Sequence, residues 1–153
     1  ALPIAGNSVF TAEELTLWFE QRGNRSHAQA PIAELAEAYI AEGRDEHIRG
    51  DMAFAQSVLE TGSFSNDDTI RFNNFAGVGH CDTCATGFAF PSPALGVRAQ
   101  IQLLRDYTQK GAKLAHPLMD RRLRGPSGCC QDWTELTSTW ATNTNYGPKI
   151  LGV

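Results

Sequence analysis

The sequence predicts a mainly α-helical domain with one small irregular or β lobe, and three observations support this fold class. Five or six segments carry apolar residues at helical spacing with capping signals at their starts. A stretch rich in Gly, Asn, Asp and Cys, at 63–87, separates the third predicted helix from the fourth. The chain has 153 residues, a length typical of one domain. We therefore expect a single domain over 1–153 with its small lobe at about 63–91.

The first two helices have clear start signals. One is expected over 11–22, where Thr11 and Glu14 have the spacing of a capping box. The next is expected over 31–42, because proline favours the first helical position and Gly43 is suited to end the helix.

The later helices follow the same logic. The third is expected over 51–60 and is apolar almost all round, which predicts a position in the middle of the fold, with Gly62 ending it. The fourth is expected over 92–109, beginning with a Ser-Pro cap, and the fifth over 132–141. A short last helix is expected over 146–151.

Charge and hydropathy exclude two function classes. The net charge is −4 and no long Lys/Arg run is present, which argues against nucleic acid as a partner. No apolar stretch reaches the ~18–20 residues that a membrane span needs. The sequence begins at Ala1 without methionine, which we interpret as a removed signal or a trimmed chain. We expect a secreted monomer.

The four cysteines form two tight pairs, Cys81 with Cys84 and Cys129 with Cys130. This usage favours an exported protein with disulfides. Bonds between the two pairs are preferred because they close longer loops, but bonds within each pair remain open. A four-cysteine zinc site, with His80 adjacent, is the alternative. No histidine spacing typical of a catalytic metal is present, so we expect neither metal nor cofactor.

Glu60 is the strongest candidate for chemistry. It stands at the end of the apolar third helix, where apolar neighbours and the negative end of the helix dipole both favour the uncharged carboxyl. A carboxylic acid held in that form can donate a proton to a leaving oxygen, as in glycoside cleavage. The alternative is a glutamate that simply points to solvent.

Four segments, in order, resemble motifs of the bacterial glucosaminidase family, the autolysin and flagellar peptidoglycan hydrolases. They cover roughly 32–151 and are Ala55-Gln56 with Leu59-Glu60-Thr61-Gly62, Asn73-Asn74-Phe75-Ala76-Gly77-Val78, Phe88-Ala89-Phe90-Pro91-Ser92, and Ala141-Thr142-Asn143-Thr144-Asn145-Tyr146. The resemblance implies a lysozyme-like fold with a cleft and peptidoglycan as the substrate. It also implies that Glu60 is the general acid and that Tyr146 lies across the cleft and assists.

The resemblance leaves the second catalytic group open. Family members often carry another acidic residue in the small lobe, and Asp82 is the carboxylate between residues 80 and 86. Asp67 and Asp68 compete for this role. If none reaches the cleft, the substrate's own N-acetyl group could attack the anomeric carbon. The sugar's C6 hydroxyl could also attack, as in lytic transglycosylases.

Aromatic and amide side chains around the lobe are candidates for substrate binding. Phe64, Phe75 and Phe90 could stack on sugars, and Asn74 could bond an N-acetyl group, although core packing and turn formation are the alternatives. The sequence thus predicts an endo-β-N-acetylglucosaminidase. A muramidase or lytic transglycosylase, a non-catalytic wall-binding or structural module, and a zinc-stabilised interaction domain remain as alternatives.

Overall fold

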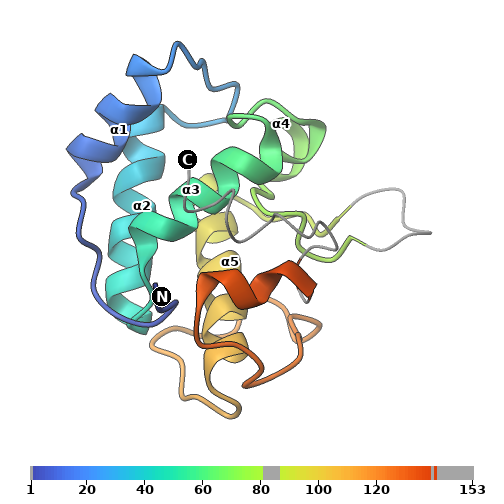
Figure 1. Cartoon of the computed structure of the whole chain (residues 1–153). Helices are drawn as coiled ribbons and strands as arrows, with labels where there is room; N and C mark the ends of the chain where they lie inside the picture. The colour runs from blue at the N-terminus through green and yellow to red at the C-terminus, as the bar shows by residue number, and fades with distance from the viewer. Residues whose placement is uncertain (1, 81–86, 139, 141–153) are drawn as a thin grey trace.

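Five α-helices and one 3₁₀ helix make up the regular structure in this computed structural model, which describes residues 2–80, 87–138 and 140 (Figure 1). The expected mainly helical fold is confirmed. Strand-like pairing within the described residues is limited to two isolated bridges, Pro3 with Asp132 and Ala5 with Ile48. The elements are α1 (Ala12–Gln21), α2 (Ile32–Glu46), α3 (Gly50–Thr61), α4 (Asp67–Phe72), α5 (Pro93–Thr108) and the 3₁₀ helix η1 (Trp133–Ser138).

Helix α2 packs against α1, α3 and α5, and α3 crosses in front of α2 and α5 in Figure 1. The ring of Phe54 on α3 lies at the centre of an aromatic cluster with Trp18, Phe19, Tyr39 and Phe64, at centroid distances between 5.6 and 6.3 Å. The nearly all-apolar α3 is therefore buried, as its sequence predicts. None of the described helices has the length and apolar character that crossing a membrane requires.

Two predicted helix starts and one predicted helix end are confirmed by their caps. Thr11 and Glu14 form the expected capping box of α1, with reciprocal bonds of 3.1 Å. The Ser92 side chain accepts from the Leu95 amide at the start of α5. Gly62 ends α3 in the left-handed conformation, with φ of 59°.

The expected end of α2 at Gly43 is wrong, because the helix continues to Glu46. A Cβ at Gly43 would lie 2.6 Å from the Ile48 carbonyl oxygen, and one at Gly50 would lie 2.0 Å from the Tyr39 carbonyl oxygen. These glycines let α2 and the start of α3 approach closely. The chain turns instead at His47, in the left-handed region with φ of 56°.

The small lobe differs from the irregular or β structure expected over 63–91. Its described part contains helix α4 and no strand. The Asn66 side chain caps α4 by accepting from the Thr69 amide at 2.9 Å. Six residues are too few to show a helical period, so the Ser-Asn-Asp-Asp run was indistinguishable from a turn in the sequence.

The fifth predicted helix starts where expected but is a 3₁₀ helix that ends at Ser138. The Glu135 carboxylate accepts from the amides of Gln131 and Asp132, at 3.2 and 3.1 Å. The helix expected over 146–151 lies outside the described residues.

Asp51, near the start of α3, ties the N-terminal segment to this helix. Its carboxylate accepts from the amides of Val9 and Phe10, at 2.9 and 3.2 Å, and from the Arg49 guanidinium, at 2.9 and 2.7 Å. Burial opposes ionisation of Asp51, but these bonds outweigh it and hold its pKa below the usual value.

Candidate functional site

Glu60 lies in the last turn of α3 and is half-buried. The end of this helix is fixed on both sides of the glutamate. The Thr61 hydroxyl donates to the Ser57 carbonyl oxygen at 2.6 Å and accepts from the Phe64 amide at 2.7 Å. The left-handed Gly62 then turns the chain away. The backbone that carries the carboxyl group is therefore held in one position.

A buried polar network joins the middle of α3 to α2 and α5. The Tyr39 hydroxyl donates to Gln100 Oε1 at 2.6 Å and also contacts the Ser57 hydroxyl at 2.7 Å. The Gln100 amide donates to Gln56 Oε1 at 2.9 Å. Burial raises the pKa of Tyr39 far above its usual range, although the bond to Ser57 lowers it, so the phenol stays a neutral donor. This network sets the position of α3, and with it that of Glu60.

The loop after α4 is organised by the side chain of Asn74. Its amide donates to the carbonyl oxygens of Val78 and Phe88, at 2.7 and 2.9 Å, and its Oδ1 accepts from the Val78 amide at 3.0 Å. The chain on either side of the undescribed segment is thereby joined by one buried amide. Asn74 is fully buried, so its observed role is to shape the loop.

Gly77, at the turn of this loop, lies beside the Glu60 carboxyl group. A Cβ there would lie 3.6 Å from Glu60 Oε2 and 3.8 Å from Cδ2 of His80, and the φ of +65° also favours glycine. Gly77 and His80 line a cavity of about 220 Å³ together with Val78, Gly79, Phe88, Leu103, Tyr107, Arg122, Leu123, Arg124 and Trp140. The Glu60 carboxyl group thus lies beside a residue that lines this cavity.

His80, which like Glu60 lies beside Gly77, is hydrogen-bonded to Asp68. Nε2 of His80 is hydrogen-bonded to Oδ2 of Asp68. The Asp68 side chain is 9% exposed, whereas the His80 side chain is 43% exposed and faces the cavity. The carboxylate is therefore the buried partner that fixes the ring, and the ring is the accessible partner.

Aromatic rings and arginines line the other side of the cavity. The Trp140 indole donates to the Ala76 carbonyl oxygen at 3.0 Å, and its ring lies 5.2 Å from that of Tyr107. The Arg122 guanidinium lies 4.0 Å from the centre of the Phe88 ring. The pKa of Tyr107 is raised mainly by burial and also by the negative charge of the neighbouring Asp106, so this phenol stays neutral.

Three phenylalanines that the sequence offers for substrate binding lie in the core instead. Phe64 is 0% exposed, Phe75 is 1% exposed, and their rings pack edge to face at 5.7 Å. Phe90 is 7% exposed, and its amide donates to the Phe72 carbonyl oxygen at 2.9 Å. A sugar could reach these rings only if the core opened. The open aromatic ring of this region is that of Phe88, which lines the cavity.

The other predicted site residues, Tyr146, Asp82, Cys81 and Cys84, lie outside the described residues. The Sγ atoms of Cys129 and Cys130 lie 2.14 Å apart, at bonding distance. This geometry corresponds to the within-pair alternative rather than to the preferred bonds between pairs.

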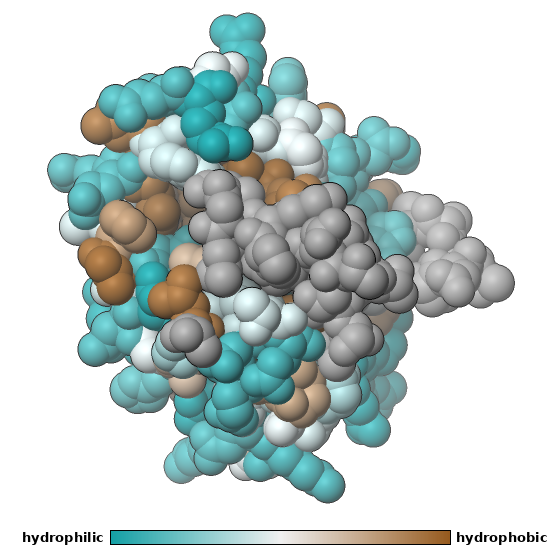
Figure 2. Space-filling view, in the orientation of Figure 1, coloured by the Kyte–Doolittle hydropathy of each residue, from teal (hydrophilic) through white to brown (hydrophobic). Residues whose placement is uncertain are grey.

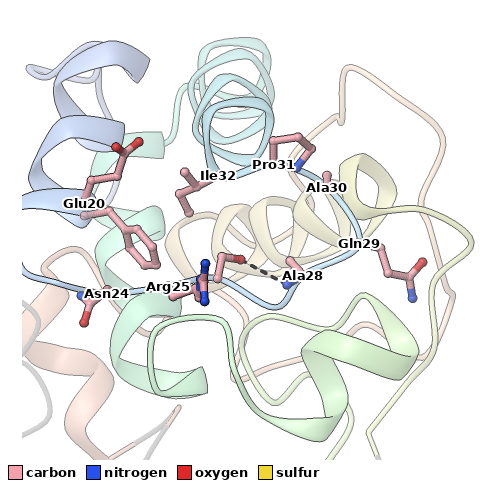
Figure 3. A pocket seen from close by; sticks show the side chains of 10 residues that line it. Glu20, Asn24, Arg25, Ala28, Gln29, Ala30, Pro31 and Ile32 are labelled. Atoms are coloured by element: carbon pink, nitrogen blue, oxygen red, sulfur yellow. Dashed lines mark hydrogen bonds between the residues drawn. The ribbon is translucent and has the colours of Figure 1, made fainter.

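Two further hollows contain none of these predicted residues. One, of about 440 Å³, lies between the end of α1 and the loop into α2, and Figure 3 shows Glu20 and Gln29 on its opposite sides. The second, of about 650 Å³, is lined by α1 and the start of α3. It borders the exposed apolar residues Val9, Phe10 and Leu17, and Figure 2 shows apolar patches on this face.

Within the described part of the chain, one group has side chains arranged to hold a metal ion. It consists of Glu42, Asp45 and His116, whose ligand atoms lie within 4.8 Å of one another. Glu42 already accepts from Arg98 Nε at 2.6 and 3.1 Å. A fixed guanidinium at this position disfavours a cation, so we interpret the group as an ion-pair network.

Sequence reasoning missed two features of this region, and only one of them has a signal in the sequence. Gln100 falls on the apolar face of its helix, between Val97 and Leu104, and a polar residue in such a position indicates a buried network. The pairing of Asp68 with His80 has no comparable signal, because the two residues are twelve positions apart, one in the short helix α4 and the other in the loop after it.

Comparisons with known proteins identify a family that matches most of this chain. A family model for glucosaminidases, described as mannosyl-glycoprotein endo-beta-N-acetylglucosaminidase, matches residues 36–153. A protein of Borreliella burgdorferi, described only as uncharacterized, is 28% identical over 118 residues. The aligned part is 76% of this chain and 58% of that protein, so the chain spans less than two thirds of its relative.

Proposed function

This chain belongs to the glucosaminidase family, and we propose that it is a glycoside hydrolase that cuts the glycan strands of peptidoglycan. The specific activity proposed is that of an endo-β-N-acetylglucosaminidase, which releases reducing N-acetylglucosamine ends. Glu60 is the general acid and protonates the leaving glycosidic oxygen. The site of action is the cell wall.

The observation that carries the proposal is the position of the Glu60 carboxyl group. It is half-buried at the end of a helix, beside Gly77, which lines a cavity and has no side chain to cover the carboxyl group. Partial burial and the negative end of the helix dipole both favour the protonated acid that this role requires. The network around Gln100 supports the proposal because a general acid must be held within hydrogen-bond reach of its substrate.

Two residues enter the proposal on the family resemblance alone. Tyr146 is proposed to donate a hydrogen bond that stabilises the reacting sugar. Asp82 is a candidate for the second carboxylate. Because both lie outside the described residues, their roles depend on activity measurements of Tyr146→Phe and Asp82→Asn.

The test of Glu60 is the release of reducing ends from purified peptidoglycan. Glu60→Gln keeps the shape of the side chain but removes the acidic proton, so we expect a loss of at least about 100-fold. Glu37→Gln, the same change at an exposed position on α2, is the matched control and should retain full activity. A Glu60→Gln variant as active as the parent would reject the assignment.

Mass spectrometry of the digested wall separates the related activities. Reducing N-acetylglucosamine ends support the proposal, reducing N-acetylmuramic acid ends indicate a muramidase, and anhydro-muramic ends indicate a lytic transglycosylase. Binding to peptidoglycan without cleavage at any pH would instead indicate a non-catalytic wall-binding module.

A further inference from the structure

We propose that His80, oriented by Asp68, is the group that activates the attacking water in this site. The inference rests on the proposed function, because it supplies the second catalytic group that a hydrolase with Glu60 as its acid needs. It starts from three observed features, which are the fixed ring of His80, its accessible face and its nearness to Glu60.

The hydrogen bond to Asp68 determines which ring nitrogen can act as a base. An ionised carboxylate only accepts hydrogen bonds, so Nε2 of His80 carries the hydrogen in this contact. In the neutral ring, Nδ1 then holds the free lone pair. Within the described residues, no group is hydrogen-bonded to Nδ1 of His80. The bond to Asp68 therefore favours the tautomer with hydrogen on Nε2, in which the basic Nδ1 points away from the carboxylate.

Glycines allow the ring to occupy this position. A Cβ at Gly87 would lie 3.0 Å from Cδ2 of His80 and 2.6 Å from the Val78 carbonyl oxygen, so this residue leaves the space that the ring needs. The His80 amide also donates to the Gly77 carbonyl oxygen at 3.1 Å. The imidazole is thus held by its backbone, by its neighbours and by Asp68.

The separation of His80 from Glu60 is compatible with an acid and a base that act on one bond. A Cβ at Gly77 would lie 3.6 Å from Glu60 Oε2 and 3.8 Å from His80 Cδ2. The distance between these two atoms therefore cannot exceed the sum of the two values. Inverting glycosidases separate their acid and base by about 6.5–9.5 Å to leave room for a water molecule, and this upper limit does not exceed that range. The geometry therefore allows direct attack by water.

The reaction balances with these two groups and one water molecule. Glu60 gives its proton to the glycosidic oxygen as the bond from that oxygen to the anomeric carbon breaks. The water oxygen bonds to the anomeric carbon from the opposite face, and its proton passes to Nδ1 of His80. The imidazolium then releases this proton to solvent, and Glu60 is reprotonated. The new reducing end is formed with inverted configuration.

The decisive variant is His80→Gln. A glutamine amide can still donate to Asp68 but cannot take up a proton, so it keeps the structural bond and removes the base. We expect kcat to fall by about 10²–10⁴, the range typical of general base catalysis, with little change in KM. His80→Ala should be equally slow, and added imidazole should restore its rate at least about tenfold.

Asp68 is a positioning residue, and its test is non-additivity. Asp68→Asn should lower kcat in the parent but have no further effect on His80→Ala, because both changes remove the same function. The matched control is the exposed pair of His116 with Asp45, joined at 2.8 Å at the end of α2. His116→Ala should retain full activity and show no response to imidazole.

The outcomes separate this inference from the proposed function. If the parent releases reducing ends in a Glu60-dependent way but His80→Gln is fully active, the role of His80 is rejected and the hydrolase assignment stands. Proton NMR at early times supplies a second check, since an initial β-anomer would also overturn direct attack by water. If the parent cuts no peptidoglycan, both proposals fail together.

Discussion

Replacing Gln100 by leucine tests whether the buried polar network holds α3 in place. Gln100 is fully buried and uses both ends of its amide. Its Oε1 accepts from Tyr39 and Ser57, at 2.6 and 2.9 Å, and its Nε2 donates to Gln56 Oε1 and the Ala53 carbonyl oxygen, at 2.9 and 3.2 Å. Leucine is similar in size, so the change removes these bonds while leaving little empty space.

The expected loss of stability follows from the groups that are affected. In the variant, Tyr39 and Ser57 can keep the hydrogen bond between their hydroxyls, which are 2.7 Å apart. Only one of the two hydroxyl hydrogens takes part in this bond, so the other loses its acceptor when Gln100 is removed. Gln56 Oε1 loses a donor as well. Removing one partner of a buried polar group costs about 1–3 kcal/mol, so two affected groups give a loss of roughly 3 kcal/mol in the free energy of unfolding.

The assay is equilibrium unfolding in urea, with Gln102→Leu as the matched control. Gln102 is also buried, but it bonds loop backbone, donating to the Pro117 carbonyl oxygen at 3.0 Å and accepting from the Met119 amide at 2.8 Å. Loop groups can turn to water, so this variant should lose only about 1 kcal/mol. A Gln100→Leu variant no less stable than Gln102→Leu would refute the role of the network.

Three further predictions concern the helices that carry the site. Asp51→Asn should remove the stability that the lowered pKa of this carboxyl group provides. That stability is present above the unfolded pKa of about 3.9 and is lost as the pH falls towards the folded pKa. Thermal melts of the parent and the variant should therefore differ at neutral pH and converge in acid. Gly96→Ala should give a protein that unfolds at markedly lower temperature or does not fold, because its Cβ would lie 1.8 Å from the Asn73 carbonyl oxygen; no change on melting would contradict this. Thr11→Ala should cost about 1 kcal/mol in urea unfolding by removing the cap of α1, whereas an unchanged midpoint would argue against the capping box.

Local signals in the sequence predicted the helices because capping is decided within a few residues. Thr11, Ser92 and Gly62 mark the observed ends of α1, α5 and α3 by hydrogen bonds or backbone geometry close by in the chain. Position at the end of a buried helix likewise identified Glu60 as the candidate acid. Periodicity failed where the element was short, as in α4, or where a glycine served another purpose, as Gly43 does.

Contacts between distant segments decided the rest of the site. Phe64 and Phe75 could have lined a cleft or filled the core, and only the packing of α3 against its neighbours puts them inside. Asn74 could have faced a sugar, but it bonds a carbonyl group fourteen residues away. The pairing of His80 with Asp68, and the nearness of His80 to Glu60, depend on how the loop folds over the end of α3. The sequence by itself therefore determined most of the helices and singled out Glu60 as the candidate acid. The surroundings of Glu60 were decided by the tertiary structure, because they are made by chain segments that meet only on folding.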